Sequence, residues 1–490
     1  MVSPVLKPLS GDGARRLKEF LASCGYTHET FRDTPALREL PSGTGASELA
    51  MAHTAEPSTL NVLVRFFFLG MSQEADVAEQ FVPATITEML LESGVLARDG
   101  SLFVPTVMLT PCDDYLFAAD TWMRMVETPQ NVVVWPNPST RVLQQFALRT
   151  PTGSTLDLGT GCGILAVAAA GYSACVVATD LNPRAGDFVA LNAALNGVSN
   201  IEYRLGDAFE PLRGCMFDRI LSNPPFFISP NSGQMYCEND MELDQFCRRI
   251  VRESAAHLNE GGFFQATVEW VQIHGQKWQE RIAEWVEALG CDAWISRTYG
   301  RDIAGYAHAR VHQTWLADQR PGKFAEWLAY YRDRGVEEIH GGLLAMRRRS
   351  GRNWVRIEEM PANPSGPFGG DLPAIFDTQD ILAAHPTDPE LMEMKPRLAP
   401  HVQLEQKYQP GEAGWSTASL RLQLHGGIPG AMAVERQVAD FAAQCDGVKT
   451  LGELSQDLSS RIKVPLDLVR QQCCAVVRKL ADGRFIYISR

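Results

Sequence analysis

The sequence predicts an α/β protein built around a doubly wound, mostly parallel sheet. From residue 154 onward, short apolar segments alternate with helical ones: STLDLGT and SACVVATD are strand-like, and AVAAAG lies between them as a helix. The segments IEYRLGD, FDRILSN and GGFFQATVE continue as strands with helices between them. Strands separated by helices pair in parallel through helical crossovers, so this alternation predicts a doubly wound sheet. A glycine-rich turn directly after the first of these strands supports the same fold class.

Length and composition place the chain among soluble proteins of several domains. It has 490 residues, of which 45% are hydrophobic and 21% charged. A single hydrophobic core rarely serves so long a chain, so we expect about two to four domains. The sequence has no apolar run of the roughly 18 residues that a membrane span needs. It also lacks a long apolar segment after the first basic residues, so we expect no secretory signal.

Cysteine spacing and net charge exclude further classes of function. The eleven cysteines are irregularly spaced and form no C-x-x-C pair, which argues against a zinc site. Reduced thiols in a cytoplasmic protein are the better interpretation. The net charge of −13 does not favour a nucleic-acid-binding surface over the whole molecule.

Residues 1–128 are expected to form an N-terminal module that resembles a winged helix. A helix is predicted within residues 1–20, followed by the apolar segment NVLVRFFFLG, a second helical pattern and the strand-like LFVPTVML. Residues 1–150 contain 11 basic and 17 acidic side chains. This balance argues against DNA binding and favours a module that packs against the rest of the chain.

Residues 129–358 are expected to form the central domain, which begins with a strand, a turn and a helix in NVVVWPNPSTRVLQQFALRT. It includes a helical insertion near 302–334 and two later strand-like segments. The Pro/Gly-rich stretch 359–372 is predicted to be a linker. Residues 373–490 combine strand-like and helical pieces, which predicts a C-terminal α+β module, and a second winged-helix-like fold is one interpretation of it.

The segment LDLGTGCG carries the first sign of chemistry. An apolar strand that contains Asp157 leads into Gly159, Gly161 and Gly163, and a helix follows. Glycine lets the backbone approach a ligand without a side-chain clash. The spacing is G-x-G-x-G, which differs from the G-x-G-x-x-G of dinucleotide-binding turns.

Two carboxylates end the next two strands. Asp180 ends VVATD, where it can accept hydrogen bonds from both hydroxyls of a ribose. Asp207 in LGDAF is placed to meet an adenine amine, and the backbone of Ala208 can contact the edge of the ring. Each could instead be an ordinary acid in a turn, but their positions at successive strand ends favour a nucleoside site.

The fourth strand ends in Asn223-Pro224-Pro225-Phe226, a pattern suited to binding a weakly nucleophilic nitrogen. A nitrogen conjugated to a carbonyl or an aromatic ring has a delocalised lone pair. The Asn223 side-chain oxygen and the following proline carbonyl can both accept hydrogen bonds from an NH2 group, and proline keeps that acceptor rigid. Phe226 offers a flat face for stacking on a base or an amide. A simple Pro-Pro turn is the alternative.

This combination resembles the class I S-adenosylmethionine-dependent methyltransferases, and in particular the group with an N-P-P-Y/F motif. That group includes protein-glutamine methyltransferases that act on release factors and RNA methyltransferases that modify adenine or guanine amines. The resemblance covers about residues 130–300, including LNAALNG at 191–197. It implies a Rossmann-like core with a seven-stranded, mostly parallel sheet, S-adenosyl-L-methionine as cofactor, and a protein or RNA as methyl acceptor.

The resemblance also assigns residue roles. The methionine moiety would be lined by Asp157, Gly159, Gly161 and Gly163, the ribose held by Asp180, and adenine flanked by Asp207 and Ala208. The target nitrogen would be held by the segment from Asn223 to Phe226. Glutamine methyltransferases usually have tyrosine where this sequence has Phe226, so protein glutamine and RNA base both stay open as acceptors. A catalytically silent protein that senses S-adenosylmethionine is the second class of function.

A basic and aromatic stretch is the candidate contact for the macromolecular substrate. Residues 297–356 contain 12 arginine and lysine residues against 6 acids, including Arg347-Arg348-Arg349 and several aromatic side chains. This mixture suits RNA or an acidic protein. The alternative is a solvated face combined with core aromatics. His308 and His312 lie four residues apart without an evident third ligand, so no metal is expected.

Overall fold

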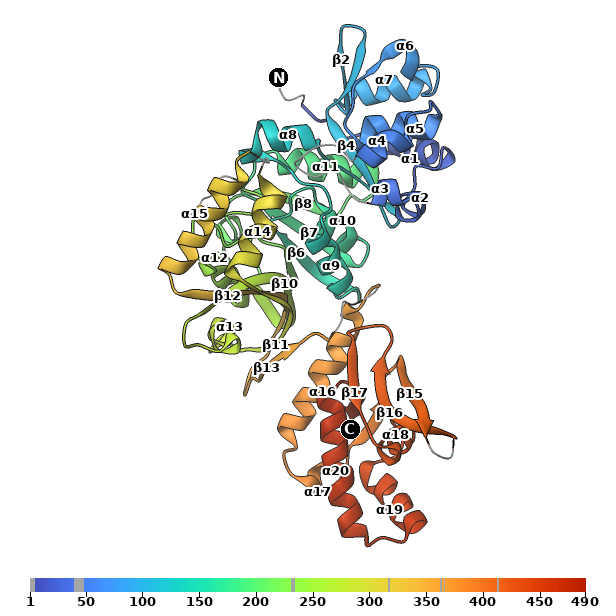
Figure 1. The fold of residues 1–490 in the computed structure, drawn as a ribbon, viewed down its shortest axis with the longest axis vertical. Helices are drawn as coiled ribbons and strands as arrows, with labels where there is room; N and C mark the ends of the chain where they lie inside the picture. The colour runs from blue at the N-terminus through green and yellow to red at the C-terminus, as the bar shows by residue number, and fades with distance from the viewer. Residues whose placement is uncertain are drawn as a thin grey trace. The chain divides into compact units, whose positions relative to one another are not determined.

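A computed structural model describes residues 5–38, 48–230, 234–315, 318–361, 364, 366–411 and 414–490. The chain divides into two compact units (Figure 1). One comprises Met1–Gln144 and Pro151–Glu358, and the other comprises Gln145–Thr150 and Glu359–Arg490. The first unit runs across the predicted boundary at residue 128, and the second unit resumes at residue 359, the first residue of the predicted linker. The predicted domain assignment itself stays a prediction. Residues 362, 363 and 365 of that linker lie outside the described part.

The N-terminal part of the first unit is helical and ends in a small sheet. Its helices are α1 (Gly11–Ser23), α2 (His28–Asp33), α3 (Pro35–Arg38), α4 (Glu48–His53), α5 (Thr59–Leu63) and the π-helix η1 (Val64–Phe68). There follow β1 (Gln73–Glu74), α6 (Ala75–Ala78), α7 (Ala84–Glu92), β2 (Leu96–Asp99) and β3 (Leu102–Pro105), and the sheet order is β1-β3-β2. This order of elements is that expected of a winged helix, a classification that stays a prediction.

The segment LFVPTVML forms two strands instead of the single expected one. At Thr106, the hydroxyl donates to the Gly94 carbonyl at 2.5 Å and the N–H donates to the Val95 carbonyl at 3.1 Å. After it, β4 (Val107–Cys112) pairs with β5 (Tyr115–Asp120) in a separate hairpin. Strand β3 therefore ends at Pro105, directly before Thr106, which the strand-like composition did not reveal.

Asn192 of α11 (Ala185–Leu195) and Asn196, the residue that caps the end of this helix, join β5 to the central domain. The Asn192 side chain accepts from the Ala118 N–H at 2.6 Å and donates to the Ala118 carbonyl at 2.8 Å. Asn196 forms the same pair of bonds with Leu116, at 3.0 and 2.8 Å. Residues four apart share one helix face, so the two amides supply β5 with the partners that a neighbouring strand would otherwise supply.

The central sheet has eight strands, one more than the seven expected. Their order is β13-β11-β12-β10-β9-β6-β7-β8. The strands are β6 (Thr152–Leu158), β7 (Ser173–Asp180), β8 (Ile201–Leu205), β9 (Phe217–Ser222), β10 (Leu258–Ile273), β11 (Cys291–Asp302), β12 (Val336–Arg348) and β13 (Val355–Glu359). Strands β8, β7, β6, β9 and β10 pair in parallel, and β12 pairs antiparallel with both β10 and β11. The extra strand is β13, which extends the β11 edge.

Helices cover both faces of the parallel strands. Besides α11 they are α10 (Ile164–Ala170), α12 (Gln245–Ser254) and α13 (Trp278–Val286). Alternate residues of β7 belong to different clusters: Val177 packs with residues of α12 and α13, whereas Val176 and Ala178 pack with residues of α10 and α11. Side chains of a strand alternate between faces, so these helix pairs lie on opposite sides of the sheet.

The start of the central domain differs from the expected strand. Residues 132–137 form no regular strand, and α9 (Pro138–Phe146) follows. The Val133 N–H donates to the Asp120 carboxylate at 2.7 Å, and the Asp120 N–H donates to the Val133 carbonyl at 2.9 Å. Pro136 and Pro138 lack the N–H that a strand ladder needs. The expected insertion is present as α14 (Ile303–Thr314) and α15 (Arg320–Asp333).

The second unit has its own core. It contains η5 (Gly369–Asp371), α16 (Leu372–Ala384), α17 (Asp388–Leu391), β14 (Lys395–Leu398), β15 (Val402–Gly411), β16 (Gly414–Leu424), β17 (Gly430–Ala433), α18 (Arg436–Ala442), α19 (Leu451–Ile462), α20 (Leu466–Asp482) and β18 (Ile486–Ser489). The final strand β18 pairs with β14. Cys473 and Cys474 are buried in this core, and all eleven cysteines are free thiols. Within the described residues, no helix combines the length and apolar character needed to cross a membrane.

Candidate functional site

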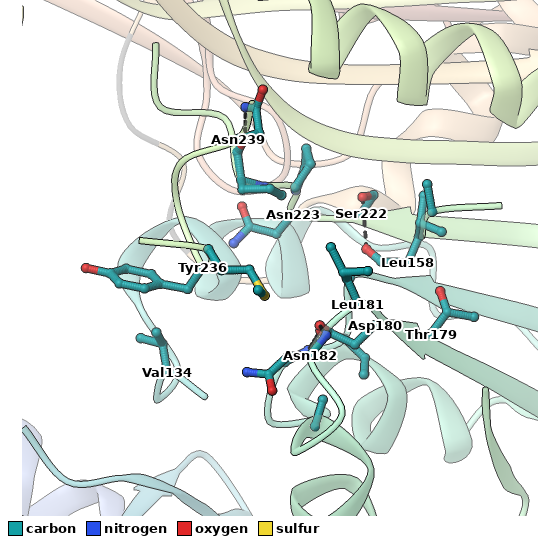
Figure 2. A pocket seen from close by; sticks show the side chains of 18 of the residues that line it. Val134, Leu158, Thr179, Asp180, Leu181, Asn182, Ser222, Asn223, Tyr236 and Asn239 are labelled. Atoms are coloured by element: carbon teal, nitrogen blue, oxygen red, sulfur yellow. Dashed lines mark hydrogen bonds between the residues drawn. The ribbon is translucent and has the colours of Figure 1, made fainter. Parts of the chain in front are cut away.

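A pocket lies at the carboxyl ends of the parallel strands of the first unit (Figure 2). Its volume is about 400 Å³. This edge is where open α/β sheets bind their ligands. The predicted site residues that line it are Gly159, Gly161, Asp180, Asp207, Ala208, Asn223, Pro224 and Pro225. The other three predicted residues, Asp157, Gly163 and Phe226, are not among its lining residues.

The glycine turn leaves one wall of the pocket as bare backbone. Gly159 and Gly161 have φ angles of +75° and +55°, and a Cβ atom added at either would meet nothing within 4 Å. Gly163 has φ of +85°, but a Cβ atom there would lie 3.2 Å from the Val189 side chain. The first two glycines therefore leave room for a ligand. The third permits α10 to pack closely against α11.

Asp180 is fixed at the end of β7 by two backbone donors. Its carboxylate accepts from the Gly161 N–H at 2.7 Å and from the Asn182 N–H at 2.8 Å. Burial raises the pKa of Asp180, and these two hydrogen bonds oppose that shift. In Figure 2, Asp180 lies beside Asn182 and Leu181 in the lower part of the pocket. A carboxylate oxygen has capacity for more than one hydrogen bond, so Asp180 can also accept from ligand hydroxyls.

Asp157 lies beneath the glycine turn and is fully buried. One of its oxygens accepts from the Thr160 hydroxyl at 2.6 Å and the Ala166 N–H at 2.9 Å. The other oxygen is buried and has no hydrogen-bond partner among the described residues. Burial raises the pKa of Asp157 to about 7. In this structure Asp157 supports the turn from below, instead of lining the ligand pocket as expected.

Asp207 forms an ion pair with Arg249, a residue that the sequence analysis did not single out. The Arg249 guanidinium of α12 donates to the Asp207 carboxylate at 2.9 Å and to Glu253 at 2.9 Å, and Arg249 also lines the pocket. Ala208 has a left-handed φ of +45°, which turns the chain immediately after Asp207. The sequence signal that could have identified Arg249 is its position as a basic residue in the helix that precedes the fifth parallel strand, β10.

Asn223 is held from two sides. Its amide nitrogen donates to the Thr140 hydroxyl at 2.8 Å, and its oxygen accepts from the Thr267 hydroxyl. The Pro225 carbonyl accepts from the Asn239 amide at 2.9 Å. In Figure 2 the Asn223 amide points toward the side of the pocket on which Tyr236 lies.

Phe226 faces the core side of its loop. It packs against the hydrophobic cluster between the sheet and α12 and α13, and its ring centroid lies 5.7 Å from that of Phe227. The Arg310 guanidinium of α14 lies 4.0 Å from the Phe227 ring centroid. The Phe226 ring is partly buried against this cluster and is not a lining residue of the pocket, and its stacking on a substrate stays a prediction.

The helical insertion supports the same loop. The Tyr306 hydroxyl accepts from the Ile228 N–H at 3.2 Å, and the Tyr331 hydroxyl donates to the Ile228 carbonyl at 2.5 Å. Arg310 and Tyr306 both bond to the buried carboxylate of Glu269 on β10. These aromatic and basic side chains were candidates for a partner surface, but their contacts lie inside the protein.

The three consecutive arginines at the end of β12 and directly after it also form hydrogen bonds within the protein. Arg347 and Arg349 both donate to the fully buried Asp292 carboxylate, at 2.8 and 2.6 Å. Arg348 donates to the Leu289 carbonyl at 2.8 Å. These three side chains thus have hydrogen-bond partners within the protein, and contact of residues 297–356 with a macromolecular substrate stays a prediction. Groups of three or more metal-binding side chains are absent from the described part of the chain.

Comparison with known proteins agrees with this geometry. Residues 136–284 match the family described as Methyltransferase small domain, and residues 34–106 match a domain of unknown function (DUF7059). The chain is 38% identical to the release factor glutamine methyltransferase of Cereibacter sphaeroides over 26% of this chain and only 50% of that protein. It is 37% identical to the protein of that name from Vibrio cholerae, over 48% of this chain and 80% of that protein. It is 34% identical to the ribosomal RNA small subunit methyltransferase C of Shigella flexneri, over 22% and 29% of the two chains.

The Vibrio cholerae protein is matched over most of its length, and the family match covers the glycine turn, both strand-end acids and the Asn-Pro-Pro motif. Enzymes of this type use S-adenosylmethionine as the methyl donor. The chain belongs to the class I S-adenosylmethionine-dependent methyltransferases, in the group that contains the methyltransferase small domain.

Proposed function

We propose that this protein transfers the methyl group of S-adenosylmethionine to the side-chain amide nitrogen of a protein glutamine. One observation carries the proposal: the glycine turn, Asp180 and the Asn223-Pro224-Pro225 segment all line one pocket. In this proposal the glycine turn and Asp180 form the donor site, and the Asn223-Pro224-Pro225 segment forms the neighbouring acceptor site for an NH2 group. Relatives named as release factor glutamine methyltransferases support glutamine as the acceptor.

The residues of the pocket fit the methyl donor. Its volume of about 400 Å³ is within the range of small-molecule sites. Gly159 and Gly161 leave an open cradle that a Cβ atom would fill. Asp180 would hold the ribose, and Asp207 with Ala208 would flank adenine. When bound, S-adenosylmethionine supplies an electrophilic methyl group on its sulfonium.

The chain's own residues would position the acceptor. We assign the Asn223 side-chain oxygen and the carbonyl of the following Pro224 as the two acceptors for the target NH2, since both residues line the pocket. Hydrogen bonds to both N–H groups would orient the nitrogen lone pair toward the methyl group and raise its electron density. Rate enhancement would come from proximity and preorganised dipoles. A strong base is unnecessary, because the nitrogen loses its proton readily once it is methylated.

Charge near the acceptor end of the pocket favours a protein over RNA. Asp240 lines the pocket and is exposed to solvent, whereas Glu238, which also lines it, is buried. RNA phosphates are attracted by lysine and arginine and repelled by carboxylates. RNA base amines remain the second candidate, because the Shigella flexneri relative is named as an RNA methyltransferase.

The test is transfer of labelled methyl from S-adenosylmethionine into the macromolecules of a cell extract prepared without this protein. We expect protease treatment, and not RNase treatment, to release the label. Release by RNase would transfer the assignment to an RNA base. A silent sensor, the other class expected from the sequence, would bind the donor and leave no label in either fraction.

A further inference from the structure

A chain of hydrogen bonds leads from the start of α9 to the Asn-Pro-Pro motif. Asn137 directly precedes α9, and Pro138 occupies its first position, where no N–H is needed. The Asn137 side-chain oxygen accepts from the Thr140 N–H at 3.0 Å, which caps the helix. The same oxygen accepts from the hydroxyls of Thr140 at 3.0 Å and Ser139 at 2.7 Å.

The direction of these bonds determines the orientation of the Asn223 amide. A threonine hydroxyl has one hydrogen, and Thr140 donates that hydrogen to Asn137. Toward Asn223, the Thr140 oxygen can then only accept, and it does so from the amide nitrogen at 2.8 Å. The opposite side of the amide must therefore be its oxygen, which accepts from the Thr267 hydroxyl of β10. Thr140 and Thr267 are both buried, so water does not readily replace either partner.

The orientation matters for chemistry at this pocket. A carbonyl oxygen has two lone pairs, and Thr267 occupies one of those on Asn223. The other can accept from a target NH2. If the amide turned over, its own NH2 would face the target NH2, and two donors would meet without an acceptor. The amide therefore has to be held with its oxygen toward the acceptor site.

We propose that Thr140, oriented by Asn137, is a positioning residue that holds Asn223 with its oxygen available to the target nitrogen. Thr140 acts through Asn223. The proposal rests on the proposed function of Asn223, and it assigns a role to a residue that lies 83 positions earlier in the chain. It also gives the WPNPST segment a function besides starting a helix.

Two variants of Thr140 and one control test the role. Thr140→Val keeps the side-chain shape and removes the acceptor, whereas Thr140→Ser keeps the hydroxyl. Ser139→Ala is the matched control, because the Ser139 hydroxyl donates to the same Asn137 oxygen without contacting Asn223. The readouts are the maximal rate of labelled methyl incorporation into serial dilutions of extract and the Kd of S-adenosylhomocysteine by calorimetry.

We expect Thr140→Val to lower the maximal rate by about three- to tenfold, the scale of one lost hydrogen bond. The Kd of S-adenosylhomocysteine and the half-saturating amount of extract should stay within about twofold of the wild type. Thr140→Ser should recover most of the rate, and Ser139→Ala should match the wild type. An unchanged rate in Thr140→Val, or an equal loss in Ser139→Ala, would overturn the proposal.

A double-mutant cycle separates positioning from general support. In an Asn223→Ala background, Thr140→Val should cause no further loss, because the bond through which the proposal has Thr140 act has been removed. Thr140 also lines the pocket, so a direct contact with the ligand would instead give an equal loss in both backgrounds. An equal loss in both backgrounds contradicts the proposal. If Asn223→Ala itself keeps full activity, the proposed function of the motif fails instead. Should Thr140→Val not fold, Thr267→Val removes the bond on the other side of the amide and is tested in the same cycle.

Discussion

The Asp180 carboxylate accepts the backbone N–H of Gly161 at 2.7 Å, which joins two parts of the pocket that lie 19 residues apart in the sequence. The acid at the end of β7 and the glycine turn after β6 therefore form one structural unit. A change at Asp180 alters both the proposed ribose contact and the position of the turn.

Replacing Asp180 by alanine should weaken binding of S-adenosylhomocysteine by at least tenfold. Hydrogen bonds to a charged group are worth about 1.5–3 kcal/mol, and the turn also loses its Gly161 partner. Calorimetry measures the effect. Asp187→Ala, at an exposed acid of α11, is the control and should leave the Kd unchanged. Equal affinities in wild type and Asp180→Ala would remove the ribose assignment.

Replacing Asn223 by alanine should lower the rate of methyl transfer far more than the affinity for the donor. Loss of one preorganised group that contacts the reacting atoms costs on the order of a hundredfold to a thousandfold in turnover. An interaction realised mainly in the transition state affects the rate, so the Kd of S-adenosylhomocysteine should hardly change. The labelled-methyl assay and calorimetry measure the two quantities. Full activity in this variant would show that the motif does not hold the target nitrogen.

Phe226→Ala should act mainly through stability. The ring packs against the core cluster and is not a lining residue of the pocket, so its removal leaves a void in the protein. Full burial of a phenylalanine contributes about 3–5 kcal/mol by this substitution, and we expect less here because Phe226 is only partly buried. Urea unfolding measures the loss. Phe226→Leu should restore most of it, and a large rise in the half-saturating amount of substrate without destabilisation would favour stacking on the substrate.

Breaking the pair between Arg347 and Asp292 should destabilise the fold. Asp292 is fully buried, and removal of one partner of a buried ion pair costs about 3–5 kcal/mol. Arg349 and Asn353 also bond to Asp292, so we expect the lower end of that range for Arg347→Gln. Urea unfolding measures the change, with the exposed Arg352→Gln as control. A loss of substrate affinity with unchanged stability would return this stretch to the role of a partner surface.

Asp157 should make the stability depend on pH. Burial raises its pKa in the folded protein to about 7, from 3.8 for the unperturbed group. The folded state therefore binds the proton more tightly than the unfolded state. The resulting stabilisation is complete below about pH 4 and is lost as the pH rises through about 7.

Asp157→Asn resembles the protonated acid and cannot ionise. Between pH 5 and pH 8, the free energy of unfolding of the wild type should fall relative to that of Asp157→Asn, as measured by urea unfolding at each pH. Other titrating groups are common to both proteins, so the difference reports on Asp157. Parallel pH profiles would mean that Asp157 stays ionised in the folded state.

The sequence alone determined the alternation of strands and helices, the glycine turn, and the residues at the carboxyl ends of β7, β8 and β9. These are local properties: a parallel strand is recognised by its own apolar run, and its end by the polar residues that follow. Since the ends of parallel strands meet at one edge of a sheet, the fold class requires Asp180, Asp207 and Asn223 to lie close together. The pocket contains all three.

Only the tertiary structure decided which side of a loop or turn each side chain occupies, and what it contacts there. Phe226 packs inward because α12 to α14 cover its loop, and Arg347 is buried because Asp292 of the neighbouring strand lies opposite it. Thr140 meets Asn223 across 83 residues. Contacts of this kind depend on the packing of distant segments against one another, and no pattern within one segment of the sequence encodes them.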